Sequence, residues 1–408
     1  MNLIFITLSS INCISERGIY ADLMRKFRDE GHHVYIVSPC ERRIQRQTHI
    51  IDANGVKILK VRTLNIQKTN VVEKGLGTVM IEGQFKRAIR KHWGDIKFDL
   101  ILYSTPPISF TNVVCYLKKQ NPKAINYLLL KDIFPQNAVD IGMFSENSLF
   151  YKYFRCKEIA LYKASDFIGC MSPANVEFVL KHNSFIEKEC IEVAPNSIEI
   201  IEKSLSQEHT ERSTERRYIR NKYGLPKDTP IFIYGGNLGK PQGIDYLIKC
   251  LETNKCRKDC FFIVIGNGTE YHKLASWYAE NKNSNVKLMQ RLPKEDYDIL
   301  AKSCDVGLIF LDYRFSIPNY PSRMLSYLNL KKPIICCTDP ITDIGRIAED
   351  NGYGYWCKSK RPEDFTKLVD KMLVSNRNEM GEKGYEFLKK NYTVQNTYDA
   401  IMKHINIS

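Results

Sequence analysis

The sequence predicts an α/β protein built from two parallel-sheet domains, and three observations predict this class. Short apolar runs alternate with helix-period stretches along nearly the whole chain, which is the pattern of parallel α/β architecture. The 408 residues exceed the usual domain size of about 100–200 residues. The alternation is interrupted once, near residue 200, by a polar and highly charged stretch, which separates two halves of similar length.

The first half begins with a strand–helix–strand unit. Leu23 and Phe27 lie on one face of the helix expected at 19–30, and Gly31 follows as its C-terminal stop. Further strands, each followed by a helix, complete a sheet that is buried on both faces. The strands of this half are expected at 2–8, 34–38, 99–103, 124–130, 166–171 and 190–193.

The second half repeats the pattern after a linker. Residues 197–217 are crowded with charge and lack periodicity, so we assign them to the linker. The predicted domains are therefore 1–196 and 218–389, with a C-terminal helix at 390–408 expected to pack back on the first. Because ligands bind at the carboxyl ends of parallel strands, we expect a cleft between the two halves. The strands of the second half are expected at 231–234, 261–265, 286–288, 306–310 and 333–337.

Composition and charge exclude several classes of protein. No apolar run approaches the roughly 18–20 residues that span a bilayer, and the N-terminus lacks the features of a secretory signal. We therefore expect a cytoplasmic protein that can lie peripherally on the inner face of the cytoplasmic membrane. The thirteen cysteines include no C-x-x-C pair and are expected to be reduced. The net charge of +14 favours an anionic partner, but no nucleic-acid-binding module is present, so nucleic acid is not expected.

The positive charge is concentrated in one segment. Residues 42–91 hold twelve Lys or Arg side chains against three acidic ones. A helix is expected at 74–93, with a broad apolar face and a basic face. This helix could pack on the first sheet, lie on an anionic membrane surface, or do both. The apolar face is assigned to Leu76, Val79, Met80, Ile89 and Trp93, and the basic face to Lys86, Arg87, Arg90 and Lys91.

A glycine-dense loop follows the first strand of the second half. Gly236, Asn237 and Lys240 lie in this loop, which leads directly into a helix. Glycines let a backbone approach a phosphate closely, and a lysine adds positive charge. A tight turn that needs glycine for its dihedral angles alone is the alternative. The P-loop pattern is absent.

Two further loops of the second half are candidates for binding a nucleotide. Gly266 and Gly268 follow the next strand and either approach a ligand or only make a sharp turn. Arg323 stands at the start of a helix expected after the strand at 306–310, where a guanidinium can bind phosphate oxygens in pairs. It is preceded by Tyr320, Pro321 and Ser322.

Asp132 is the candidate catalytic carboxylate of the first half. It follows the strand at 124–130 and could bind sugar hydroxyls or assist a proton transfer, although a role as helix N-cap is equally compatible with its position. No H-E-x-x-H motif or D-x-D pair is present, so the sequence predicts no metal site and no resident cofactor.

Taken in order, these motifs resemble the GT-B glycosyltransferases, and most closely the retaining family 4 type of capsule, O-antigen and lipid-linked glycan synthesis. The resemblance covers nearly the whole chain. Its anchors are the segments 30–34, 103–107, 132–135, 172–173, 194–197, 236–243, 265–268, 291–293 and 321–323.

The resemblance implies a hexosyltransferase that uses a nucleotide-sugar donor, with a UDP-sugar favoured, and a glycan or polyprenyl-diphosphate-linked acceptor. The second domain would hold the donor and the first domain the acceptor. The diphosphate would contact Lys240, Arg323 and the backbone at Gly236 and Ser322, and Gly18 would approach it from the first domain. The nucleotide base would rest near Arg291, Leu292 and Pro293.

The chain also departs from the family pattern at the donor site. The usual Arg and Lys of the glycine-rich loop are replaced by Asn237 and Gln242. Ser326 stands where a Glu normally binds the ribose hydroxyls, and its usual partner falls near Pro318. A GT-B protein that binds without turnover, and a sugar-nucleotide epimerase of the same fold, therefore remain alternatives.

Overall fold

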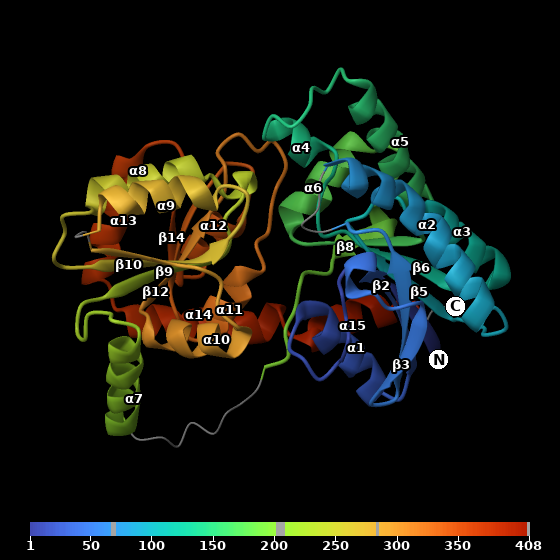
Figure 1. Cartoon of the computed structure of the whole chain (residues 1–408), viewed down its shortest axis with the longest axis horizontal. Coiled ribbons are helices and arrows are strands. Elements are labelled where there is room, and N and C mark those ends of the chain that lie inside the picture. Colours follow the sequence, from blue (N-terminus) through green and yellow to red (C-terminus); the bar gives the residue numbers. More distant parts are fainter. Residues whose placement is uncertain (67–70, 201–208, 283–284, 406–408) are drawn as a thin grey trace. The chain divides into compact units, whose positions relative to one another are not determined.

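The computed structural model describes residues 1–66, 71–200, 209–282 and 285–405 of the chain. These residues form two compact units. The first comprises residues 1–199 and 392–408, and the second residues 200–391. Each unit has its own sheet and its own buried core, and each is described by itself (Figure 1).

The first unit contains an eight-stranded sheet in the order β3-β4-β2-β1-β5-β6-β7-β8. All neighbouring strands are parallel except β3 and β4. The strands are β1 (Asn2–Ile6), β2 (His33–Glu41), β3 (His49–Ala53), β4 (Val56–Thr63), β5 (Leu100–Ser104), β6 (Ile125–Leu129), β7 (Phe167–Cys170) and β8 (Ile191–Val193). The helical segments are α1 (Ile19–Asp29), η1 (Arg42–Ile44), α2 (Val71–Trp93), α3 (Thr111–Gln120), α4 (Gln136–Asp140), α5 (Leu149–Lys163), α6 (Pro173–His182), η2 (Lys188–Cys190) and α15 (Val394–Met402).

Helices cover the first sheet on both faces, as the continuous apolar strands require. Leu3 and Phe5 of β1 pack against Phe27 of α1 on one face, and Ile401 of the C-terminal helix α15 joins the same core. His32, which follows α1, is joined to Tyr398 of α15 by a 2.9 Å hydrogen bond. Helices α2, α3 and α5 lie beside one another in a separate layer (Figure 1).

Helix α2 confirms the helix expected at 74–93, but its faces differ from the prediction. Ile89 and Trp93 are buried, whereas the side chains of Val79 and Met80 are 64% and 45% exposed. Leu76 lies outside the described side chains. The apolar face that packs inward is instead completed by Ile81 and Phe85, which shows that the helix packs on its own domain. Its association with a membrane surface stays a prediction.

The strand pair β3–β4 was not expected from the sequence, and it accounts for part of the basic segment. Lys60 in β4 is buried, and its Nζ donates to Ile11 O at 3.1 Å and to the hydroxyls of Ser10 and Ser38 at 3.2 and 3.1 Å. Burial lowers the pKa of Lys60 to about 8. This lysine therefore fastens the loop after β1 and does not contribute to a basic surface.

The second unit contains a six-stranded parallel sheet in the order β11-β10-β9-β12-β13-β14. Helices α8, α9 and α13 lie over one face, and α10, α11 and α14 over the other (Figure 1). The strands are β9 (Ile231–Asn237), β10 (Phe261–Asn267), β11 (Val286–Met289), β12 (Val306–Phe310), β13 (Ile334–Thr338) and β14 (Gly354–Lys358). The helical segments are α7 (His209–Lys222), η3 (Lys240–Gln242), α8 (Ile244–Asn254), α9 (Tyr271–Glu280), α10 (Lys294–Ser303), α11 (Arg323–Asn329), α12 (Ile344–Asp350), α13 (Pro362–Val374) and α14 (Arg377–Asn391).

The polar stretch assigned to the linker is only partly a linker. Helix α7 begins at His209, within the predicted linker 197–217, and belongs to the second unit. Arg220 in this helix is fully buried and donates to Asp305 at 2.7 Å. Its other donors bind backbone carbonyls, among them that of Ser303 at 3.0 Å. The buried contacts of Arg220 therefore fix α7 to the second unit. No local pattern indicated these contacts, because the segment is predominantly polar. Residues 201–208 lie outside the described residues.

Among the helices that the structure describes, none has both the length and the apolar character needed to span a bilayer. All thirteen cysteines are free thiols, as expected. Within the same described residues, no three His, Cys, Asp or Glu side chains gather in a way that could hold a metal ion.

Candidate functional site

The strand order of the second unit identifies where a ligand is expected. Strands β10 and β11 lie in turn on one side of β9, and strands β12, β13 and β14 lie in turn on its other side. The order reverses between β9 and β12, which are direct neighbours. In open parallel sheets, ligands bind outside the carboxyl ends of the strands at such a reversal. The loops after β9 and β12 therefore form the candidate site of this unit.

The loop after β9 is held by its own polar side chains. Asn237 Nδ2 donates to Gln242 Oε1 at 2.9 Å, and the same oxygen accepts from Gly239 N at 3.2 Å. Gly236 has a φ of 131°, a conformation that strongly favours glycine. The two residues that replace the usual basic pair of this loop thus bind each other and fix its shape, while Lys240 is exposed in η3.

Gly266 and Gly268, at the end of β10, pack closely against this loop. A Cβ on Gly266 would lie 1.9 Å from the carbonyl oxygen of Gly236, and a Cβ on Gly268 would lie 2.4 Å from that of Leu238. Leu238 N also donates to Asn267 O at 2.9 Å. The two glycines are therefore required for close packing of one loop on the other, and the space where their side chains would extend is filled by protein.

The side chain of Arg323, at the start of α11, lies against the glycine-rich loop. Its guanidinium carbon lies 4.5 Å from the ring centroid of Tyr234 and 3.5 Å from the point where a Cβ on Gly236 would be. Its Nη1 is buried and has no hydrogen-bond partner within the protein. A buried donor of a cationic group is costly when it lacks a hydrogen-bond acceptor, and an anion supplies one. The arrangement is thus suited to an anion beside Gly236.

Tyrosines that the sequence analysis did not single out surround this arginine. Tyr327 OH accepts from Gly235 N and donates to Ile233 O, both at 3.1 Å, and burial raises its pKa to about 12. A Cβ on Gly235 would lie 2.0 Å from Tyr297 OH. The spacing of Tyr327 four residues after Arg323 on one helix was the available signal, because such residues share a helix face.

The other predicted residues of the second unit lie after β11 and around the start of α11. Arg291 and Pro293 are exposed and Leu292 is half-buried, between β11 and α10. Before and within α11, Tyr320 is buried, Ser322 is exposed, and both Pro321 and Ser326 are half-buried.

Asp132 of the first unit lies at the carboxyl end of β6. Its Oδ1 accepts from Asn137 Nδ2 at 2.6 Å, and its backbone N–H donates to Thr105 Oγ1 at 3.3 Å. The alternative role as an N-cap is wrong, because Pro135 occupies that position before α4. Burial raises the pKa of Asp132 to about 6, so this carboxyl can hold or release a proton near neutral pH.

Replacement of Asp132 by Asn is expected to flatten the dependence of unfolding free energy on pH. The carboxyl binds its proton more tightly in the folded protein, with a pKa of about 6 against 3.8. Its contribution to stability is therefore full below about pH 4 and is lost as pH rises through 6, by up to about 3 kcal/mol. Chemical denaturation from pH 4 to 8 measures the difference. Parallel profiles of the variant and the wild type would contradict the prediction.

Gly18 precedes α1 in the first unit, in the loop that follows β1. Its backbone N–H donates to Asp22 Oδ1 at 3.0 Å, and no atom lies within 4 Å of the point where its Cβ would be. The space beside Gly18 is therefore open, in contrast to that beside Gly266 and Gly268.

Comparisons with known proteins show which sequences and folds this chain resembles. Residues 215–387 match the family model described as "Glycosyl transferases group 1". The probable glycosyltransferase WbjE of Pseudomonas aeruginosa is 23% identical over 268 residues, which is 65% of this chain and 64% of WbjE. The matched stretch thus spans less than two thirds of that relative.

Two solved structures share the fold over almost the whole chain. HepE of Anabaena in complex with UDP-glucose has a TM-score of 0.70 at 11% identity and covers 100% of both chains. WaaG, a glycosyltransferase involved in lipopolysaccharide biosynthesis, has a TM-score of 0.65 at 12% identity and covers 98% of both. The chain therefore has the two-domain GT-B fold, and its residues 215–387 match the family model of the group 1 glycosyl transferases.

Proposed function

We propose that this protein is a glycosyltransferase that moves a hexosyl group from a nucleotide-diphosphate donor, with a UDP-sugar favoured, to a glycan or polyprenyl-diphosphate-linked acceptor. The observation that carries the proposal is the buried, unpartnered Nη1 of Arg323 above Gly236, at the strand-order reversal of a group 1 domain. The names of WbjE and WaaG and the UDP-glucose bound by HepE support the reaction class, a role in surface polysaccharide synthesis and the donor.

The proposed reaction proceeds with retention of configuration at the sugar. The bond between the anomeric carbon and the β-phosphate oxygen breaks as the acceptor oxygen forms its bond on the same face. The acceptor proton passes to the departing phosphate oxygen, so negative charge grows on the diphosphate before the proton arrives. Arg323, which is already held against Tyr234 and Gly236, would stabilise that charge, with Lys240 of η3 as a second cation.

Asp132 is proposed to act at the acceptor. Its carboxylate is oriented by Asn137 at the carboxyl end of β6 and is half-buried. A carboxyl in this state can accept a hydrogen bond from an acceptor hydroxyl when ionised and donate one when protonated. It would therefore orient the attacking hydroxyl, while the leaving diphosphate takes the proton.

A panel of nucleotide sugars tests the proposed function. A ligand that binds only the folded state raises stability by RT ln(1 + [L]/Kd). UDP-glucose is expected to raise the thermal unfolding temperature, and GDP- and dTDP-sugars to do so less. Product analysis then separates the reaction classes, because an epimerase returns an altered nucleotide sugar, whereas a transferase releases UDP. If no nucleotide sugar stabilises the protein, the proposal fails.

A further inference from the structure

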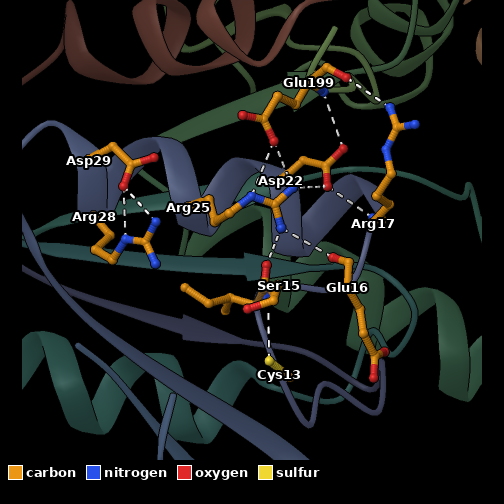
Figure 2. A network of polar contacts seen from close by, with 11 residues as sticks. Cys13, Ser15, Glu16, Arg17, Asp22, Arg25, Arg28, Asp29 and Glu199 are labelled. Atoms are coloured by element: carbon orange, nitrogen blue, oxygen red, sulfur yellow. Dashed lines mark hydrogen bonds and ion pairs between the residues drawn. The ribbon is translucent and has the colours of Figure 1, made fainter. Parts of the chain in front are cut away.

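A network of polar contacts that includes the backbone N–H of Gly18 lies at the start of α1 (Figure 2). Its centre is Asp22, whose side chain is only 2% exposed. Asp22 Oδ1 accepts from Gly18 N at 3.0 Å and from Arg25 Nη2 at 2.6 Å, and its Oδ2 accepts from Glu199 N at 3.2 Å. One carboxylate thus binds two segments far apart in the sequence.

Arg25 joins the same two segments through its guanidinium. Its Nη1 donates to the carbonyl oxygens of Ile14 and Glu16 in the loop 13–18, the latter at 3.2 Å. Its Nε and Nη2 donate to Glu199 Oε2 at 3.2 and 2.9 Å. Figure 2 shows Arg25 between the loop and Glu199. The side chain of Arg25 is 13% exposed, whereas that of Glu199 is 44% exposed.

Glu199 stands where the chain leaves the first unit. Ile198, the preceding residue, donates its backbone N–H to Tyr392 O at 3.0 Å and accepts from Val394 N at 3.1 Å. The segment by which the chain leaves the first unit is therefore hydrogen-bonded to the segment by which it returns. Arg17 of the loop also donates to Glu199 O at 3.0 Å. The loop 13–18 is consequently bonded to the point at which the chain passes between the units.

We propose that Arg25 is a positioning residue that couples the loop 13–18 to the chain passage at Glu199, and so sets the backbone of this loop for the transfer reaction. The inference rests on the proposed function for its catalytic consequence. It follows from the geometry that a change in the path of residues 198–199 is transmitted to the loop through one guanidinium and the Asp22 carboxylate. The backbone at Gly18, which has open space beside it, is then held in a defined position.

Hydrogen exchange tests the coupling without any substrate. Glu199→Ala removes the carboxylate that Arg25 binds but keeps the backbone groups that bind Asp22 and Arg17. Glu199 is half-exposed, so the variant is expected to fold. Backbone amides of residues 13–18 are expected to exchange about tenfold faster in this variant, and Glu199→Gln is expected to fall between the variant and the wild type.

Asp29→Ala is the matched control. It also removes a carboxylate that pairs with an arginine of α1, since Asp29 binds Arg28 on the exposed side of the helix (Figure 2). It is expected to leave exchange in residues 13–18 unchanged. Wild-type exchange in that loop of Glu199→Ala would overturn the coupling.

A second readout concerns catalysis and uses UDP-glucose as the probe. In Glu199→Ala, kcat for UDP release is expected to fall about tenfold, while the affinity for UDP stays within about twofold, because Arg323 of the other unit is proposed to hold the nucleotide. An equal kcat would overturn the positioning role, as would a parallel loss of UDP affinity. Failure of the wild-type protein to bind UDP would instead refute the proposed function and leave the exchange result standing.

Discussion

Arg323→Ala is expected to lower kcat for donor turnover by about 10²–10³-fold, the loss typical of removing one preorganised donor from a developing negative charge. The guanidinium lies on Tyr234 and beside Gly236, where a diphosphate would complete its unpartnered Nη1. Arg323→Lys is expected to recover only part of the rate, because a lysine offers a point charge and cannot bind two oxygens in a plane. Steady-state release of UDP from UDP-glucose measures both effects.

The stability of this variant distinguishes a functional arginine from a structural one. A buried donor left without a hydrogen-bond partner, such as Nη1, costs free energy in the unliganded protein and offsets the favourable contact with Tyr234. Arg323→Ala is therefore expected to leave the free energy of unfolding nearly unchanged or to raise it. A fall in stability that accounts for the lost rate would contradict the assignment. Arg346→Ala serves as the matched control, since Arg346 is an exposed arginine of the same unit in α12. It is expected to retain wild-type turnover.

Gly266→Ala is expected to impair both stability and donor binding. The new Cβ would lie 1.9 Å from the carbonyl oxygen of Gly236, which is backbone and cannot rotate away. The strands β9 and β10 or the loop above them must shift, at a cost of about 1–3 kcal/mol of unfolding free energy. The shift moves Gly236 under Arg323, so UDP affinity is expected to fall at least about tenfold. Denaturant unfolding and calorimetric titration with UDP measure the two effects.

Gly83→Ala provides the control for this substitution. Gly83 is an exposed position in α2, and no atom lies within 4 Å of where its Cβ would be. Alanine favours the helix over glycine by up to about 1 kcal/mol, so this variant is expected to be more stable than the wild type and to bind UDP equally well. Wild-type stability and UDP affinity in Gly266→Ala would show that the packing of the two loops does not support the site.

Local pattern predicted the framework of this protein because parallel strands buried on both faces leave continuous apolar runs in the sequence. The strand at 306–310 was predicted at the bounds that β12 has, and those of β9 and β10 lack only their last residues. Strands β3 and β4 were missed, since β4 alternates lysines with apolar residues and resembles a surface segment. Lys60 shows why this reasoning failed: its charge is buried and satisfied by partners that only the fold brings near.

The sequence by itself determined the fold class, the order of the elements and the loops in which the candidate site residues lie, because periodicity and glycine-rich turns are local properties. Only the tertiary structure decided what each residue does there. It placed Gly266 and Gly268 under a neighbouring loop, joined Arg323 to Gly236 and Tyr234, and left the Nη1 of Arg323 unpaired. Close approach and burial arise between segments far apart in the chain, so no local pattern records them.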